Sequence, residues 1–265
     1  MDPVLIAEIP ESVGLPFQAL SKFGLFSTNK LKVYIPITIL VLMLASLVLI
    51  AMLQFLYVKK DISDIVRNLE CVLGFSLVLL RMVMVTYRNK DFTRPIQTIK
   101  LFWDPSICDQ QTKVALISIR RFTYQLQRLL LLAMSIAVVL VAIVSVVQNT
   151  TPTGMWTMEG HEKLYRFVII SQIIVAPFSA FFICSLDCLY LGLCAETVIQ
   201  FRILSQYLQN LTADGKNEIK AYVTHHRLIL RFVKEFLQAF SLVLLIEVVI
   251  DGPLICAELL AAFER

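Results

Sequence analysis

The chain has 265 residues, of which 58% are hydrophobic and 17% are charged, and its formal net charge is +4 at pH 7. Soluble domains contain about 45–50% apolar residues, so this composition excludes an ordinary soluble domain and indicates a membrane protein. Backbone amides in lipid must be satisfied within their own segment, so each long apolar run predicts a helix. The expected fold class is therefore all-α, a polytopic membrane helix bundle.

Five apolar segments predict five transmembrane helices, because about 20 apolar residues cross the hydrocarbon core. The segment before them, residues 1–32, lacks the basic region of a signal peptide, so we expect a retained cytosolic segment. The rest of the chain, residues 33–265, forms the bundle. We expect its spans at about residues 33–58, 67–87, 126–147, 167–190 and 234–257, and cytosolic helical extensions at about 88–125 and 191–233.

The distribution of Lys and Arg predicts a cytosolic N-terminus. The segments that this topology places inside hold 17 of these residues, and those that it places outside hold 5. This orientation argues against a G-protein-coupled receptor, whose N-terminus lies outside. The sequon at Asn149 falls in an outside loop and is a glycosylation candidate, whereas the sequon at Asn210 falls inside.

Charged residues interrupt two of the predicted spans. Arg81 lies in the inner half of the second span, and we expect its long side chain to reach the nearby interface by snorkelling. Glu247 and Asp251 lie toward the outer end of the fifth span. They could belong to an outer vestibule that attracts cations or to a helix break at Gly252-Pro253, and we favour the break.

The adjacent pair His225 and His226 raises the question of a metal or catalytic site. Neighbouring residues on a helix point about 100° apart, so the two cannot ligate one metal from one face. No nucleophile, base and oxyanion constellation can be assembled, so we expect neither an enzyme nor a cofactor or metal site. The simplest interpretation is one packed and one solvated imidazole.

Three sequence blocks together resemble the insect odorant receptors, seven-span arthropod chemoreceptors with inverted topology. The block YVTHHRLILRFVKEFLQAFSLVLL has a His, an aliphatic pair, a Phe, and then Phe240-Ser241 opening an apolar helix. The block CSLDCLYLGLCAETVIQFRILSQYLQNL contains Gln-Phe-x-Ile-Leu-Ser from Gln200 to Ser205. In the block YRNKDFTRPIQTIKLFW, a basic patch leads into an amphipathic helix and Trp103.

The resemblance implies a ligand-gated cation channel, a hetero-oligomer with the odorant receptor co-receptor in the plasma membrane of the olfactory sensory neuron dendrite. The co-receptor carries a long insert between spans four and five that this chain lacks, so we expect an odorant-tuning subunit for apolar volatiles. The family pattern has seven helices, and we expect that this sequence is a truncated form. The alternatives are a gustatory-type chemoreceptor and a small-solute secondary transporter, although we find no internal repeat of the kind that transporters show.

The resemblance also implies an odorant pocket in the outer half of the bundle, between spans two, three, four and six. Such a pocket needs aromatic and aliphatic walls with few polar groups. Packing against helices or lipid is the more ordinary role of any single aliphatic residue, so the aromatic residues are the better candidates. The candidates are Val72, Phe75 and Leu79 in span two, Ser135, Val139 and Ile143 in span three, and Tyr165, Phe167 and Ile170 in span four.

The predicted topology can be tested by glycosylation mapping in cells. We expect the chain to carry a glycan at Asn149, because that loop faces the lumen during synthesis, and to lose it in the Asn149→Gln variant. The measurement is the mobility shift on glycosidase treatment. Modification of Asn210 in place of Asn149 would show that the orientation is the reverse of the predicted one.

Overall fold

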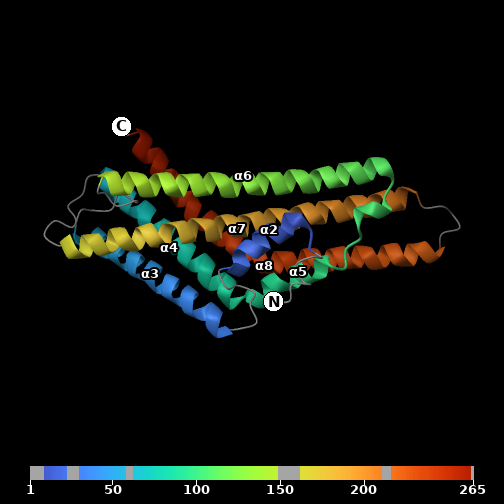
Figure 1. Cartoon of the computed structure of the whole chain (residues 1–265), viewed down its shortest axis with the longest axis horizontal. Coiled ribbons are helices and arrows are strands. Elements are labelled where there is room, and N and C mark those ends of the chain that lie inside the picture. Colours follow the sequence, from blue (N-terminus) through green and yellow to red (C-terminus); the bar gives the residue numbers. More distant parts are fainter. Residues whose placement is uncertain (1–8, 23–29, 58–61, 149–161, 211–215, 264–265) are drawn as a thin grey trace. The chain divides into compact units, whose positions relative to one another are not determined.

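The structure, a computed structural model, describes residues 9–22, 30–57, 62–148, 162–210 and 216–263, which are almost entirely helical and include no strand. This confirms the predicted all-α fold. The elements in chain order (Figure 1) are α2 (Glu11–Lys22), α3 (Lys30–Tyr57), α4 (Ile62–Tyr87), α5 (Asn89–Ile99), the short 3₁₀ helix η1 (Pro105–Ile107), α6 (Gln110–Gln148), α7 (Glu162–Gln209) and α8 (Lys216–Phe263).

Four of these helices contain segments long and apolar enough to cross a membrane. A shorter apolar stretch, Ile37–Leu53, lies in α3, at the place of the first predicted span. The chain is therefore a polytopic membrane helix bundle. The four segments are Leu69–Tyr87, Gln110–Val147, Tyr165–Gln209 and Ile219–Cys256.

The helices α6, α7 and α8 are much longer than a membrane is thick. They contain 39, 48 and 48 residues, which at 1.5 Å per residue makes them about 58 to 72 Å long. The hydrocarbon core measures only about 30 Å. Each of these helices therefore continues without interruption from an apolar segment into a polar one.

The expected helix break at Gly252-Pro253 is wrong, because α8 continues through both residues to Phe263. A proline inside a helix removes one backbone hydrogen bond. The other bonds of the helix persist, and membrane helices tolerate this loss when the freed carbonyl is satisfied elsewhere. The Gly252-Pro253 pair is therefore accommodated inside α8.

The described chain forms two compact units. The first contains α2, α5, η1 and the adjoining parts of α6, α7 and α8, at residues 88–131 and 185–241. Its interior is rich in aromatic side chains, and Phe92 of α5 packs edge-on against Phe240 of α8 with ring centroids 5.0 Å apart. The second unit contains α3 and α4, which pack along each other, with residues 132–184 and 242–265.

In the second unit, Arg81 of α4 forms an ion pair with Glu247 of α8. Only 1% of the Arg81 side chain is exposed, so the predicted snorkelling to an interface is wrong. An isolated charge in a span is costly, and pairing with an opposite charge offsets much of that cost. Glu247 therefore neutralises Arg81 inside the bundle and joins the two helices.

Replacing Arg81 by Leu should destabilise the protein, because it leaves Glu247 without its partner in the bundle. We expect the apparent thermal midpoint in detergent to fall by about 5 °C. The double variant Arg81→Leu/Glu247→Leu should recover most of this loss, since it removes both charges. The exposed Leu80 of α4, changed to Ala, is the matched control. Equal midpoints for the single and double variants would contradict the pairing.

Candidate functional site

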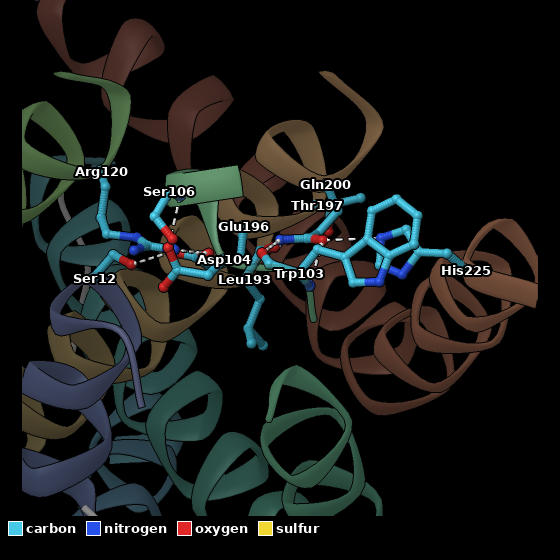
Figure 2. A network of polar contacts seen from close by, with 10 residues as sticks. All are labelled: Ser12, Trp103, Asp104, Ser106, Arg120, Leu193, Glu196, Thr197, Gln200 and His225. Atoms are coloured by element: carbon cyan, nitrogen blue, oxygen red, sulfur yellow. Dashed lines mark hydrogen bonds and ion pairs between the residues drawn. The ribbon is translucent and has the colours of Figure 1, made fainter. Parts of the chain in front are cut away.

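One face of α7 carries a row of small and polar residues at intervals of four. Cys188, Gly192, Glu196 and Gln200 follow one another along this row, and residues four apart lie on the same side of a helix. All four belong to the first compact unit. The row meets polar groups of α2, of α6, of α8 and of the segment before η1, and we call the resulting network the polar seam. Its members are Ser12, Trp103, Arg120, Gln127, Glu196, Gln200 and His225. Figure 2 shows its members other than Gln127.

The centre of the polar seam is the carboxylate of Glu196, whose side chain is 1% exposed. Arg120 of α6 binds it with two hydrogen bonds, from Nε to Oε1 at 2.9 Å and from Nη2 to Oε2 at 2.8 Å. The hydroxyl of Ser12 donates a third, at 2.8 Å, to Oε1. Paired geometry of this kind makes a buried carboxylate tolerable. Glu196 thus holds α2 and α6 against α7, as Figure 2 shows.

The backbone of α2 is held at the same place. Pro16 lies inside α2 and has no N–H, so the carbonyl of Ser12, four residues earlier, lacks its helical donor. The Nε2 group of Gln127 donates to this carbonyl at 2.7 Å and also to the carbonyl of Cys188 at 2.8 Å. A proline in α2 therefore frees an acceptor that an amide of α6 occupies.

Gly192 permits this close approach. A Cβ atom at Gly192 would lie 2.2 Å from the Ser12 oxygen and 3.1 Å from Nε2 of Gln127. Real Cβ atoms do not approach backbone oxygens so closely. Glycine is required here by the contact with α2, since it is the residue with no Cβ.

At the other end of the polar seam, Gln200 binds both backbone groups of Trp103. Its Oε1 accepts from the Trp103 amide at 3.1 Å, and its Nε2 donates to the Trp103 carbonyl at 3.0 Å. Oε1 also lies 3.0 Å from Nε2 of His225. Because Oε1 can only accept, we assign the imidazole proton to Nε2 of His225.

The imidazole of His225 stacks on the indole of Trp103, with centroids 3.7 Å apart and an interplanar angle of 3°. His225 is 3% exposed, whereas the neighbouring His226 is exposed. The histidine pair is therefore one packed and one solvated imidazole, as the sequence indicated. The role of His225 is to fix the segment before η1 against α7 and α8.

The same segment is stabilised by Asp104. Its carboxylate accepts a hydrogen bond from the Ser106 backbone amide at 2.7 Å and caps η1. The side chain and the amide of Ser106 stabilise the charged form and lower the pKa of Asp104 below its usual value. The turn between α5 and α6 is thus fixed by a charged cap at one side and by Gln200 at the other.

The polar seam binds helices together. The charge of its acid, Glu196, is balanced by Arg120. Among the described residues no group of three or more His, Cys, Asp or Glu side chains could hold a metal ion. The polar seam joins the polar parts of α6, α7 and α8 to the N-terminal helix α2.

The nine predicted pocket residues lie in the second unit, on three helices. Val72, Phe75 and Leu79 share one face of α4, where Phe75 is 9% exposed and the other two are half-buried. The pocket that the nine residues would form stays a prediction. Ser135, Val139 and Ile143 follow one another at intervals of four on α6, and Tyr165, Phe167 and Ile170 lie on α7. The exposed fractions are 55% for Val139, 53% for Ile143, 52% for Phe167 and 58% for Ile170. Asn149, the glycosylation candidate, lies outside the described residues.

Comparison with known families decides the class of the chain. The family model of the seven-transmembrane odorant receptors matches residues 61–263, which is most of the sequence. The chain belongs to the odorant receptor family. This confirms the resemblance noted in the sequence, and a chemoreceptor in a membrane follows from the family and from the long apolar helices. No curated protein sequence matched the chain. In this odorant receptor family member, the polar seam falls within the matched region except for the contribution of α2.

Replacing Gly192 by Ala should detach α2 from α7, because the added Cβ overlaps the Ser12 carbonyl. We expect trypsin to cleave after Lys22, the last residue of α2, about tenfold faster than in the wild type, which corresponds to 1.4 kcal/mol. Gly74→Ala on α4 is the matched control, because a Cβ there meets nothing within 4 Å. Both changes favour helix formation by up to about 1 kcal/mol, so equal behaviour of the two variants would refute the proposed contact.

Proposed function

We propose that the chain is an odorant-tuning subunit of a ligand-gated cation channel, assembled with the odorant receptor co-receptor in the plasma membrane. The observation that carries the proposal is the odorant receptor family match over residues 61–263. It is supported by the short connection between α7 and α8, since the co-receptor has a long insert there. The family match favours this function over a gustatory-type receptor or a transporter.

The proposed ligand is a small apolar volatile, bound in the outer half of the bundle. The candidate pocket consists of aliphatic and aromatic residues together with Ser135, and Phe75 and Tyr165 are the principal contacts. At about 25 cal/mol per Å² of buried apolar area, a small odorant gains only a few kcal/mol. Its affinity should therefore be micromolar or weaker.

The proposed orientation places the N-terminus and the polar extensions at residues 88–125 and 191–233 in the cytosol. It rests on the excess of Lys and Arg in these segments. The polar seam then lies on the cytosolic side. The extension between Phe201 and Phe236, which is basic and amphipathic, is the surface that we propose for association with the co-receptor.

The experiment is to express the tagged chain together with the co-receptor, purify the complex, and label it with an alkyl diazirine analogue of a volatile odorant. We expect co-purification, and labelled peptides from residues 69–87 or 165–174 that excess unmodified odorant protects. Phe75→Ala and Tyr165→Ala should each reduce this labelling several-fold, because they remove the largest apolar contacts.

Leu80→Ala is the control for labelling, because Leu80 is exposed on α4 and is not a pocket candidate. The co-receptor alone sets the background. Failure of the two proteins to co-purify would contradict the partner, and labelling that excess odorant does not reduce would contradict the pocket.

A further inference from the structure

The first apolar turns of α7, in the second compact unit, have one buried and one exposed face. Val168, Gln172 and Val175 follow one another at intervals of four and three residues, and they are 1%, 0% and 0% exposed. Phe167 and Ile170, two of the predicted pocket residues on this helix, are 52% and 58% exposed and belong to the other face. A ligand inside the bundle would therefore meet the buried face of α7, which the sequence analysis did not select.

The buried face carries an amide side chain, that of Gln172. Residues 165–186 of α7 are largely apolar, and Gln172 is the only Asn or Gln among them. A buried polar side chain in a membrane span is costly, which makes it a candidate for a functional role. A buried serine can bond to its own helix, as the hydroxyl of Ser145 does to the carbonyl of Val141. An amide has two donor hydrogens and a carbonyl acceptor, so one neighbouring group does not use its whole capacity.

Gln172 lies at the same depth in its span as Phe75 in α4. Consecutive spans alternate in direction, so α4 and α7, which are separated by the span in α6, enter the membrane from the same side. The apolar segment of α7 begins at Tyr165 and that of α4 at Leu69. At 1.5 Å per residue, Gln172 and Phe75 each lie about 10 Å from the start of their segment. The buried amide and a principal contact of the proposed pocket are therefore at one level, in the same compact unit.

A second polar group lies on the buried face of α7. Ser179 is two helical turns beyond Gln172 and is 6% exposed. Its hydroxyl oxygen has no hydrogen-bond partner among the described residues. Buried polar groups are normally paired, so this face offers hydrogen-bonding capacity to a molecule that enters the bundle.

We propose that Gln172 determines the specificity of the proposed ligand site, and that its amide donates a hydrogen bond to an oxygen acceptor of the odorant. The acceptor is the carbonyl oxygen of a ketone, an aldehyde or an ester. Val168 and Val175, one turn to either side of Gln172, contact the hydrocarbon part of the ligand. This inference rests on the proposed function and adds the chemical class of the ligand, an apolar volatile with one carbonyl group.

A buried amide can discriminate between ligands of the same shape. When a ligand lacks the acceptor, it buries the amide donor without giving it a partner, and this penalty is larger than the gain from a hydrogen bond that is made. Sites that bond a polar group therefore reject the analogue without that group far more strongly than apolar sites distinguish ligands of similar size. A ketone should bind better than the hydrocarbon of the same outline.

The test uses the purified complex with the co-receptor and the diazirine probe described above. The competitors are matched pairs of a 2-alkanone and the 2-methyl-1-alkene of the same chain length, which differ only in having C=O or C=CH2 at one position. The measured quantity is the concentration of each competitor that halves the labelling. The ratio of the two concentrations is compared between variants, because partition of the competitors into lipid affects every variant equally.

We expect the ketone to protect the wild type at a concentration about tenfold lower than the alkene. Gln172→Leu should bring this ratio close to one, because it removes the donor and leaves an apolar side chain of similar size. Gln172→Met, which keeps the length of the side chain, should do the same. Ile174→Ala is the matched control, since Ile174 is 45% exposed on the other face of α7 and is not a pocket candidate. It should leave the ratio unchanged.

Continued protection by the alkene in Gln172→Leu would show that the variant is folded and binds. A structural role of Gln172, in which the amide only joins α7 to another helix, predicts that the variant loses protection by both competitors alike. That result would overturn the inference, as would a wild type that does not distinguish the two competitors or a Gln172→Leu variant that keeps the preference for the ketone. Labelling that no competitor reduces would contradict the proposed pocket itself, and the inference with it.

Discussion

The arrangement of the first compact unit depends on the burial of one carboxylate. Glu196 is almost wholly removed from solvent in a long, largely apolar helix, and a buried charge without partners would cost several kcal/mol. Its partners Arg120 and Ser12 must therefore occupy fixed places, which sets the positions of α6 and α2 against α7. Gln127, Gly192 and Gln200 then extend the same contact along the helix.

The polar seam satisfies backbone groups that the secondary structure leaves open. The carbonyl of Ser12 is freed by Pro16 and is taken by an amide side chain of α6. The amide and carbonyl of Trp103 lie outside any helix and are both bound by Gln200. A buried side-chain amide suits this use, because it offers a donor and an acceptor from one planar group.

The helices could be predicted from the sequence, because long apolar runs are local features. The different surroundings of His225 and His226 could be predicted as well, because adjacent residues on a helix point in different directions. The family could be predicted from three blocks of sequence. The contacts of Glu196 and Gln200 could not, although their spacing of four was visible. Their partners on α2, on α6 and before η1 lie 76 to 184 residues away in the chain. The sequence showed Arg81 as a charge inside a predicted span, but Glu247 was assigned to the predicted helix break at Gly252-Pro253. The ion pair belongs to the tertiary structure, so no local pattern indicated it.

The hydrogen bond between Ser12 and Glu196 joins residues 184 positions apart, and this separation has a consequence for biosynthesis. A ribosome adds about 5–20 residues per second, so Glu196 follows Ser12 out of the exit tunnel after about 10–40 s. Throughout that interval the N-terminal segment lacks its Glu196 contact, while its apolar side chains Val13, Phe17 and Leu20 are fully buried in the finished protein. During synthesis these side chains are therefore available to a chaperone or to the membrane surface before α7 exists.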